Sequence, residues 1–329
     1  MKFSIVVAAY NAEKYIDECI SSLLMQDFED YEVIFVDDGS DDRTLELVKK
    51  HLKATNLKIY SQKNKGVGPA RMAGMLRSIG EYILFFDADD VLEDRLFLKK
   101  CEKYLSVSPD IIVFGAYNFR DKRSPFNKKL TNLPKFIEKG TYLGSELSPF
   151  LFQICYGWAW DKVFKREFLL KKQISFPSLR HSEDLVFVFS ALLSNPVIVI
   201  DKSIEIAHRM KYEGSVSGEY RELNPFDHFY AIEMLQKKIL QVKDKQIYQK
   251  SFNNWLITFL FWHCWSMRDR NIRAQLIRTT KNFLDQKMKA KDITSDLDFV
   301  PKMKLWLLKS PRIMNLFSPL IGCLKNKIG

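Results

Sequence analysis

The hydrophobic positions of the first hundred residues follow two alternating periods. Continuous apolar runs at residues 5–9, 33–36 and 82–86 are typical of strands that are buried on both faces of a sheet. Between these runs, apolar residues return every three or four positions, as on the buried side of an amphipathic helix. Strands that alternate with helices predict a parallel sheet with right-handed crossovers and helices on both faces. The predicted order is strand 4–10, helix 15–25, strand 31–37, helix 45–52, strand 57–62, helix 69–79 and strand 81–87.

The pattern is less regular in the second hundred residues and becomes helical and basic toward the C-terminus. Residues 1–220 are therefore expected to form an α/β domain, with residues 1–100 and 101–220 as its two halves, and residues 221–329 a helical region. The predicted elements are helix 91–107, strand 110–119, a loop over 120–140, a short helix within 157–172, a helix over 183–194 with Ser182 as N-cap, and strand 195–201.

Composition and charge restrict the partners. The chain has 329 residues, of which 47% are hydrophobic and 28% charged, and these values are typical of folded globular proteins. Its net charge of +11 favours an anionic partner, and nucleic acid, acidic lipid headgroups and nucleotide substrates all satisfy that requirement. The basic residues follow no helix-turn-helix, zinc or RNA-binding pattern, so we expect no nucleic-acid partner.

Cysteine use and the lengths of the apolar runs indicate a compartment. Five cysteines without CxxC or zinc-type spacing are expected to be reduced thiols in a cytoplasmic protein. The apolar run at residues 4–9 is too short for the core of a signal peptide. Residues 255–265 are rich in aromatic side chains but fall short of the roughly 20 residues that a membrane-spanning helix needs. We expect a buried helix or a subunit contact there.

Three carboxylates follow the strand at residues 82–86 within four positions. Asp87, Asp89 and Asp90 repel one another unless a cation joins them. The pair in Asp87-Ala88-Asp89 suits Mg²⁺ or Mn²⁺, which take one or two carboxylates together with substrate phosphates. The alternative is an acidic turn in which Asp90 caps the next helix. Because ligands in parallel sheets bind beyond the carboxyl ends of the strands, we favour a metal site here.

Two other stretches follow strand ends. Asp38, within "VDDGSDD", can accept hydrogen bonds from a nucleobase or a ribose, and an Asx-type turn is the alternative for the neighbouring acids. The stretch "NKGVGPAR" offers two glycines that let the backbone approach a ligand, with Lys65 and Arg71 available for phosphate. It matches neither the dinucleotide GxGxxG nor the P-loop pattern, which argues against NAD binding and against a P-loop enzyme.

An acid pair opens the strongly apolar helix predicted after Ser182. Glu183 and Asp184 would be favoured there by the helix dipole alone. The alternative is that one of them acts as a general base, accepting a proton from a hydroxyl group in a partly desolvated pocket. His208 follows the next predicted strand, and a lone histidine is more often structural than catalytic.

Six stretches of the first 218 residues follow one another in a recognisable order: "SIVVAAYNAEKYIDECISSLLMQ", "VDDGSDDRTLELV", "NKGVGPARMAGM", "YILFFDADD", "WDKVFKREFL" and "SEDLVFV". Together they resemble the family 2 glycosyltransferases of bacterial surface-polysaccharide type. The resemblance implies the GT-A fold, a Rossmann-like and mostly parallel sheet with flanking helices. Residues 1–100 would then bind the nucleotide-sugar and residues 101–220 the acceptor, while the C-terminal helical extension lies outside the resemblance.

The resemblance also implies an activity and roles for individual residues. The reaction would be an inverting transfer of a hexose or N-acetylhexosamine from a UDP-sugar to a hydroxyl of a saccharide, with Mn²⁺ or Mg²⁺ as cofactor. Asp184 would be the general base, Glu183 the other member of the family's acid pair, and Asp89 the metal ligand. The remaining site residues would be Ala8, Tyr10, Asp38, Arg71, Asp87 and Ala88 on the donor side, with Trp160 and Lys162 flanking the donor and acceptor pocket.

The chain departs from the family's pattern near its "GSVS" turn, where the resemblance assigns no role to His208 or Tyr212. The family often extends lipid-linked saccharides for capsule, lipopolysaccharide or exopolysaccharide, so an acceptor linked to undecaprenyl diphosphate is expected.

The C-terminal thirty residues interleave basic with apolar and aromatic side chains. Such segments can lie in the headgroup region of an anionic membrane, at the inner face of the cell membrane, and helices packed on the catalytic domain are the alternative. The sequence leaves open whether the chain forms a homo-oligomer. The competing function is an inactive nucleotide-sugar-binding scaffold in a polysaccharide assembly complex. The complete set of Asp87, Asp89 and Asp184 favours the enzyme.

Overall fold

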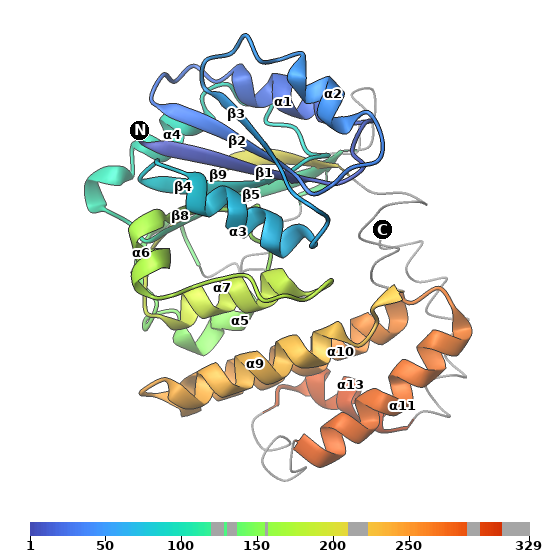
Figure 1. Cartoon of the computed structure of the whole chain (residues 1–329). Helices are drawn as coiled ribbons and strands as arrows, with labels where there is room; N and C mark the ends of the chain where they lie inside the picture. The colour runs from blue at the N-terminus through green and yellow to red at the C-terminus, as the bar shows by residue number, and fades with distance from the viewer. Residues whose placement is uncertain (120–127, 130–136, 155–156, 210–222, 288–296, 311–329) are drawn as a thin grey trace.

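The computed structural model describes residues 1–119, 128–129, 137–154, 157–209, 223–287 and 297–310. A central sheet carries helices on both faces, and the C-terminal helices lie beneath one of those faces (Figure 1). The strands are β1 (Phe3–Ala9), β2 (Tyr31–Asp37), β3 (Leu57–Ser61), β4 (Tyr82–Asp87), β5 (Ile111–Phe119), β6 (Lys128–Lys129), β7 (Gly140–Leu143), β8 (Lys162–Lys165) and β9 (Val197–Arg209). The α-helices are α1 (Ile16–Leu24), α2 (Thr44–Lys49), α3 (Val67–Arg77), α4 (Phe97–Glu102), α5 (Leu151–Ile154), α6 (Arg166–Lys171), α7 (Glu183–Leu193), α9 (Asp227–Gln241), α10 (Lys245–Ser266), α11 (Arg270–Lys287) and α13 (Phe299–Lys309).

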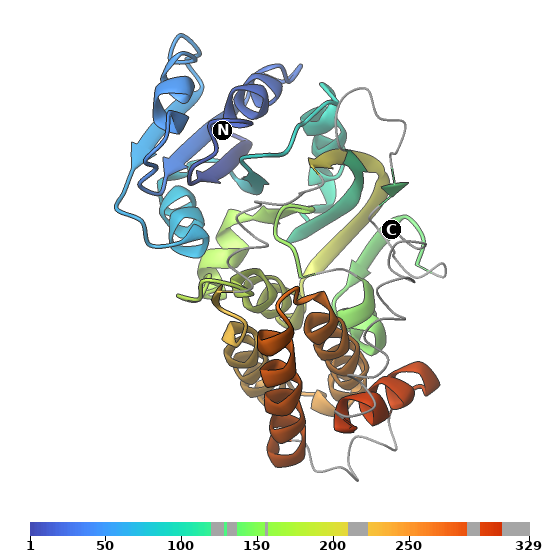
Figure 2. The ribbon, with the colours of Figure 1, turned by 90° about the vertical axis from the view of Figure 1, so that its right-hand side faces the viewer.

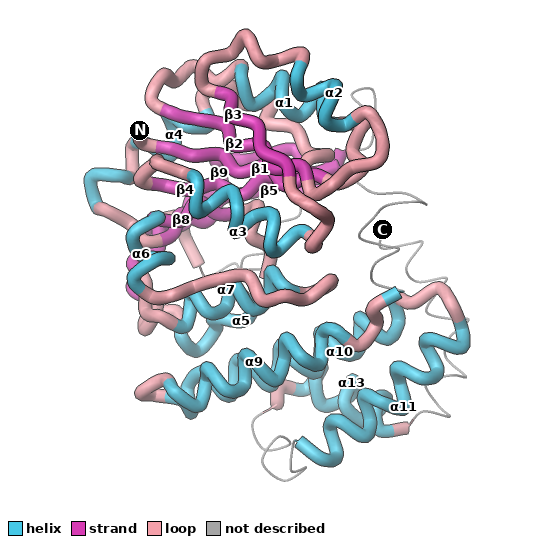
Figure 3. The backbone as a smooth tube through the Cα atoms, in the orientation of Figure 1, coloured by secondary structure: helices cyan, strands magenta, loops and turns pink. Residues whose placement is uncertain are grey.

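The sheet is parallel in its first half and mixed in its second. Within the described residues its order is β3-β2-β1-β4-β8-β5-β9-β7, with β6 paired to β5. Figure 3 shows the strands in magenta between the helices. The first four strands pair in parallel, as the sequence predicts. β8 then runs antiparallel to both β4 and β5, while β9 is parallel to β5 and antiparallel to β7. The predicted α/β fold is therefore confirmed, with antiparallel β8, β7 and β6 making the second half of the sheet mixed.

Two predicted helices differ from the structure. In place of a helix over 91–107, only α4 and a short 3₁₀ turn at Leu105–Val107 are helical. Val91 instead exchanges backbone hydrogen bonds with Ala207 of β9, which holds the start of this segment extended. Within 157–172, the strand β8 precedes the short helix α6, and the sequence prediction missed this strand. Residues 120–127 and 130–136 of the predicted loop lie outside the described part of the chain.

Ser182 occupies the N-cap position of α7 as predicted, but it does not cap the helix with its side chain. No side-chain hydrogen bond from Ser182 reaches the helix, and its φ of 69° lies in the left-handed region. This conformation is uncommon for a residue other than glycine and costs on the order of 1–3 kcal/mol, so neighbouring structure must stabilise it.

Each face of the sheet has its own hydrophobic core. One core packs α1, α2 and α4 against the sheet. The other contains α3, α5, α6 and α7 and continues without a break into the C-terminal helices. Figure 2 shows the C-terminal helices lying against this side of the sheet domain. The ring centroids of Phe152 and Phe252 are 5.2 Å apart, and those of Phe189 and Trp255 are 5.3 Å apart. The predicted boundary near residue 220 falls within residues 210–222, outside the described residues.

The aromatic run at residues 255–265 lies in α10. Leu256, Leu260 and Cys264 are buried against the second core, whereas Trp262 is 47% exposed. In the described part of the chain, none of the helices combines the length and the hydrophobicity that crossing a bilayer requires. Cys19 and Cys101, like Cys264, are buried free thiols.

Candidate active site

The carboxyl ends of β1, β2 and β4 meet at one edge of the sheet. Ala8 of β1 lies in register with Asp87 of β4, and Ala9 lies in register with Asp37 of β2. Parallel strands end at a common edge, so side chains that are far apart in the sequence are brought together there. The register therefore places Ala8 beside Asp87, and the backbone N–H of Asp38 donates to the carbonyl of Ala9 at 2.8 Å.

Asp38 holds the loop that follows β3. Its Oδ1 accepts hydrogen bonds from the Gln62 side chain at 2.8 Å and from the backbone N–H of Lys65 at 2.9 Å, and its Oδ2 accepts from the N–H of Gly66 at 2.7 Å. Gly39 follows in the left-handed region, and a Cβ there would lie 2.9 Å from the backbone N of Asn64. The turn after β2 and residues 62–66 therefore form one unit. The predicted bond from Asp38 to a base stays a prediction.

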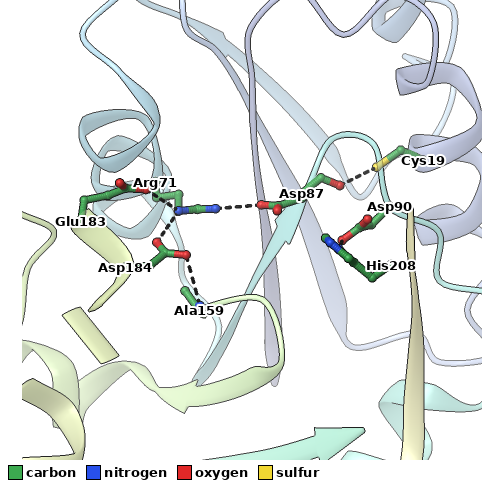
Figure 4. A network of polar contacts seen from close by, with 8 residues as sticks. All are labelled: Cys19, Arg71, Asp87, Asp90, Ala159, Glu183, Asp184 and His208. Carbon is green, nitrogen blue, oxygen red and sulfur yellow. Dashed lines mark hydrogen bonds and ion pairs between the residues drawn. The ribbon is translucent and has the colours of Figure 1, made fainter. Parts of the chain in front are cut away.

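Arg71 joins the two ends of the candidate site. This guanidinium projects from α3 and is buried, at 4% exposure. Its Nη2 lies 2.7 Å from Oδ1 of Asp87, while its Nη1 lies 2.5 Å from Oδ1 of Asp184 and 3.3 Å from Oε1 of Glu183 (Figure 4). One arginine thus links the end of β4 to the start of α7, which are almost a hundred residues apart in the sequence. Sequence reasoning selected all four residues, but not the contacts between them.

Burial and crowding set the charges in this cluster. Burial opposes the charge of Arg71, but the carboxylates of Asp184, Asp87 and Glu183 outweigh it and raise the Arg71 pKa. Burial, assisted by repulsion from Asp184, raises the pKa of Glu183 from its ordinary value of 4.5 to about 8. Burial also raises the pKa of Asp184, although Arg71 opposes the shift. Near neutral pH, Glu183 is therefore mostly protonated.

The second oxygen of Asp184 faces the segment before β8. Its Oδ2 accepts a hydrogen bond from the backbone N–H of Ala159 at 3.4 Å. Lys162 supports this segment from beneath, because its fully buried Nζ donates to the carbonyl of Trp158 at 2.9 Å and also contacts the Asp161 carboxylate. Its predicted place in the donor and acceptor pocket stays a prediction. In this conformation Lys162 supports the segment that carries Trp160.

Three aromatic rings stack beside the cluster. Trp160 lies between Trp158, with ring centroids 4.9 Å apart, and His208, with ring centroids 4.4 Å apart and planes 5° from parallel. His208 Nδ1 is 2.9 Å from Oδ2 of Asp90, which the structure buries completely. Burial raises the pKa of Asp90 to about 6, against the opposing effect of His208. The stack joins the segment before β8 to the end of β9, and the contact between His208 and Asp90 joins β9 to the turn after β4.

Asp90 fastens the acidic turn after β4, and it does not cap a following helix. Its Oδ1 accepts the backbone N–H of Arg209 at 2.9 Å, and Arg209 Nε donates to the backbone carbonyl of Asp89 at 2.8 Å. The Arg209 guanidinium also pairs with Glu18 at 2.6 Å and lies over the ring of Tyr15 at 4.8 Å. Arg209 is thus a site residue that our sequence interpretation left without a role. The sequence predicts a strand that ends at residue 201, whereas β9 continues to Arg209, so the local pattern places Arg209 outside the strand.

The acidic turn fits a hard cation that takes most of its ligands from a substrate. The described residues contain no cluster of three or more histidine, cysteine or carboxylate side chains placed to hold a metal ion by themselves. Asp87 is engaged by Arg71, and Asp89 is a half-buried carboxylate at the strand-end edge. One or two carboxylates with diphosphate oxygens are the usual ligands of Mg²⁺ and Mn²⁺ in such sites. Tyr10 and Ala88 lie at the same edge, whereas Tyr212 lies outside the described residues.

Comparisons with known proteins identify what the chain resembles. Residues 4–167 match the sequence profile described as "Glycosyl transferase family 2". The poly(ribitol-phosphate) beta-N-acetylglucosaminyltransferase TarS of Staphylococcus aureus is 29% identical over 247 residues, which cover 73% of this chain and 41% of TarS. The poly(ribitol-phosphate) beta-glucosyltransferase of Bacillus spizizenii is 27% identical over 324 residues, which cover 94% of this chain and 48% of that protein. The chain thus spans about half the length, or less, of these curated relatives.

A solved structure shares the fold. The crystal structure of S. aureus TarS residues 1–349 in complex with UDP-GlcNAc superposes with a TM-score of 0.72 at 23% sequence identity. The match covers 96% of this chain and 92% of that chain, so it includes the C-terminal helices as well as the sheet. At this level of identity the likeness establishes the GT-A architecture.

Proposed function

Because the chain belongs to glycosyl transferase family 2, we propose that it transfers a sugar from a UDP-sugar to a hydroxyl group of a saccharide acceptor, with inversion at the anomeric carbon. The observation that supports this most strongly is the placement of Asp184 at the strand-end edge, beside Arg71 and Asp87. The proposed sugar is a hexose or an N-acetylhexosamine, and the proposed pathway is the synthesis of a bacterial surface polysaccharide. The UDP-GlcNAc bound to the structural relative supports the choice of donor.

In the proposed reaction, Asp184 is the general base. Its carboxylate takes the proton of the acceptor hydroxyl while that oxygen attacks the anomeric carbon from the face opposite the diphosphate. The new bond joins the acceptor oxygen to the anomeric carbon, and the bond from that carbon to the diphosphate oxygen breaks with its electron pair leaving on UDP. Arg71 and the N–H of Ala159 each hold one carboxylate oxygen, which fixes the orientation of the base.

The donor side of the proposed site follows the strand ends. Ala8, Tyr10 and residues 62–66, which Asp38 holds and which we call the nucleotide loop, would receive the nucleobase and ribose, with Asp87 and Ala88 beside them. Asp89 would hold Mn²⁺ or Mg²⁺ together with the diphosphate. Such a cation, when bound, offsets the negative charge that grows on the leaving group. Glu183, protonated at neutral pH, would occupy the neighbouring position without competing for the acceptor proton.

Release of UDP from a panel of donors tests this function. Purified protein incubated with UDP-Glc, UDP-Gal, UDP-GlcNAc or UDP-GalNAc should release UDP from one of them slowly, because water can replace the acceptor. Adding Mn²⁺ or Mg²⁺ to protein treated with EDTA should raise the rate by at least about tenfold, since leaving-group charge is otherwise unopposed. A coupled assay for UDP measures the rate.

The same experiment separates the enzyme from its competitor, an inactive nucleotide-sugar-binding scaffold. A scaffold would bind UDP in calorimetry but would release none from any of the four donors, with or without metal. Metal-dependent release from one donor, absent in protein denatured beforehand, would exclude the scaffold.

We also propose that the acceptor is linked to a lipid and that the C-terminal helices contact an anionic membrane surface. Four exposed apolar side chains form what we call the Trp patch: Trp262 of α10 and Val300, Met303 and Trp306 of α13, which are 47%, 49%, 50% and 56% exposed. Lys304 Nζ lies 5.6 Å from the Trp262 ring centroid and joins the two helices. From residue 299 to the C-terminus, the sequence contains six basic residues and no acidic one. Exposed Trp with Lys is the composition that suits the headgroup layer of an anionic bilayer.

Flotation with vesicles tests the Trp patch. The protein should float with vesicles that contain phosphatidylglycerol and less with vesicles of phosphatidylcholine alone. Replacing Trp262 and Trp306 together by Ala should lower the floated fraction about tenfold, because two large apolar side chains no longer enter the interface.

Exposed apolar residues elsewhere provide the control for this experiment. Leu76 and Ile79, at the end of α3, are 63% and 62% exposed, and replacing both by Ala should change little. Equal flotation of the two double variants would contradict the membrane proposal. If the unmodified protein has the mass of a dimer in solution and the Trp variant has that of a monomer, the Trp patch would instead be assigned to contact with a second copy of the chain.

A further inference from the structure

A short segment between α6 and α7 leads into the helix that carries Glu183 and Asp184. Residues 177–182, which we call the base loop, end one residue before Glu183. The loop closes with Ser182 in the left-handed region, where its N–H donates to Nδ1 of His181 at 2.9 Å. Because Ser182 adopts a backbone conformation that residues other than glycine rarely take, contacts from outside the loop are needed to stabilise it.

Asp227 supplies the first such contact from the helical region. It is the first residue of α9, and its Oδ2 accepts the backbone N–H of Arg180 at 2.9 Å and that of His181 at 3.1 Å. One carboxylate oxygen therefore satisfies two successive backbone donors of the base loop. A carboxylate is also favoured at this place because it lies at the N-terminus of a long helix.

Histidine rings supply a second contact. The ring centroids of His181 and His263, which lies on α10, are 5.9 Å apart. The ring centroids of His263 and His228, which lies on α9, are 3.9 Å apart. His263 Nε2 is 3.3 Å from the carbonyl oxygen of Pro225, just before α9. Two helices of the C-terminal region thus touch the base loop at adjacent residues.

The opposite side of the base loop touches the nucleotide loop. Arg180 Nη1 donates to Oδ1 of Asn64 at 2.9 Å. The Arg180 side chain also passes over Gly66, where an added Cβ would lie 3.4 Å from Nη1. The base loop therefore has the nucleotide loop on one side, the C-terminal helices on the other, and the acid pair at its end.

We propose that Asp227 is a positioning residue, which holds the base loop so that Asp184 is presented to the acceptor. The C-terminal helices then complete the active site, although the family match ends at residue 167. The inference rests on the proposed role of Asp184. Small displacements of a reacting group lower rates strongly, because about 1 Å of misplacement can cost a hundredfold, so a loop anchor can matter without touching substrate.

Two variants of Asp227 and one matched control test this proposal. Asp227→Ala removes both hydrogen bonds, whereas Asp227→Asn keeps an amide oxygen that can accept them. The control is Asp269→Ala. Asp269 Oδ1 also accepts two successive backbone N–H groups, those of Asn271 at 2.7 Å and Ile272 at 2.9 Å, but these belong to the first turn of α11. The full chain is used throughout, with the four UDP-sugars named above and Mn²⁺.

Asp227→Ala should lower kcat for UDP release about tenfold and leave the KM for the donor within about twofold, since the donor pocket keeps its own residues. Asp227→Asn should recover most of kcat, and Asp269→Ala should keep it. Amide hydrogen exchange read by mass spectrometry should be faster at residues 178–184 in Asp227→Ala and unchanged there in Asp269→Ala.

Either of two results would overturn the proposal: a kcat for Asp227→Ala equal to that of Asp269→Ala, or unchanged exchange at residues 178–184. If the unmodified protein releases no UDP from any donor, the proposed function fails. The exchange measurement still decides whether Asp227 orders the base loop.

Discussion

Replacing Asp184 by Asn is expected to lower the transfer rate about a thousandfold, within the range that loss of a general base produces. The amide cannot take the acceptor proton, yet it preserves the size of the side chain and an oxygen for the Ala159 N–H. The folded state and the affinity for UDP should therefore change little. UDP release in the presence of Mn²⁺, together with calorimetric binding of UDP, measures both effects.

The neighbouring acid is the matched control for this variant. Glu183 has a pKa near 8 and is mostly protonated at pH 7, so Glu183→Gln replaces a neutral group by another neutral group of similar shape. Its rate should fall much less than that of Asp184→Asn. If Glu183→Gln were the more damaging change, or if Asp184→Asn retained full activity, the assignment of the base would be wrong.

Replacing Arg71 by Met is expected to destabilise the protein by about 3–5 kcal/mol, because removing one member of a buried ion-pair network leaves its partners uncompensated. The carboxylates of Asp87, Glu183 and Asp184 would then face one another inside the protein. Urea unfolding followed by tryptophan fluorescence measures the free energy of unfolding.

The pH dependence of this variant has a definite sign. Arg71 opposes the upward pKa shifts of Glu183 and Asp184, so without it the pKa values of these two groups in the folded state would lie further above those in the unfolded chain. The folded state would then bind more protons than the unfolded state, and stability would fall as the pH rises through the folded-state pKa values. The loss should therefore be larger at pH 8 than at pH 5.

The control for Arg71→Met lies on the same helix. Arg77 is exposed at the end of α3, where it donates to the carbonyl of Ala73 at 2.9 Å and covers the ring of Tyr60. Arg77→Met should change the free energy of unfolding by less than about 1 kcal/mol, at either pH. If the two variants lost similar amounts of free energy of unfolding, the guanidinium group of Arg71 would not stabilise the protein, and the prediction would be wrong.

The first half of the fold could be predicted because its strands are continuous apolar runs, a pattern that few other structures produce. β8 was missed for a physical reason. Only the four residues Lys162–Lys165 form it, and two of them are lysines, one of which is fully buried by pairing with Asp161. The helix expected over 91–107 failed because Val91 forms backbone hydrogen bonds with β9, a contact over more than a hundred residues that local periodicity does not encode.

The candidate site also has a part that could be predicted from the sequence and a part that could not. Arg71, Asp87 and the acid pair belong to local patterns and could be chosen from the sequence, although their mutual contacts could not. The N–H of Ala159 was beyond prediction, because any residue type supplies that group. Asp227 carries no sequence signal either, since an acid at the start of a helix is common. Only the folded chain shows which loop it touches.

The shared hydrophobic core has a consequence for how this architecture can diversify. Rings of α5 and α7 interlock with rings of α10, as in the pairs Phe152–Phe252 and Phe189–Trp255. A chimera that took its last hundred residues from a distant relative would place rings of other sizes at the interface between α10 and the helices α5 and α7. Voids or clashes would result there. The sheet domain and the C-terminal helices must therefore change together. A chimera that folds well would have to take α5, α7 and the C-terminal helices from the same parent.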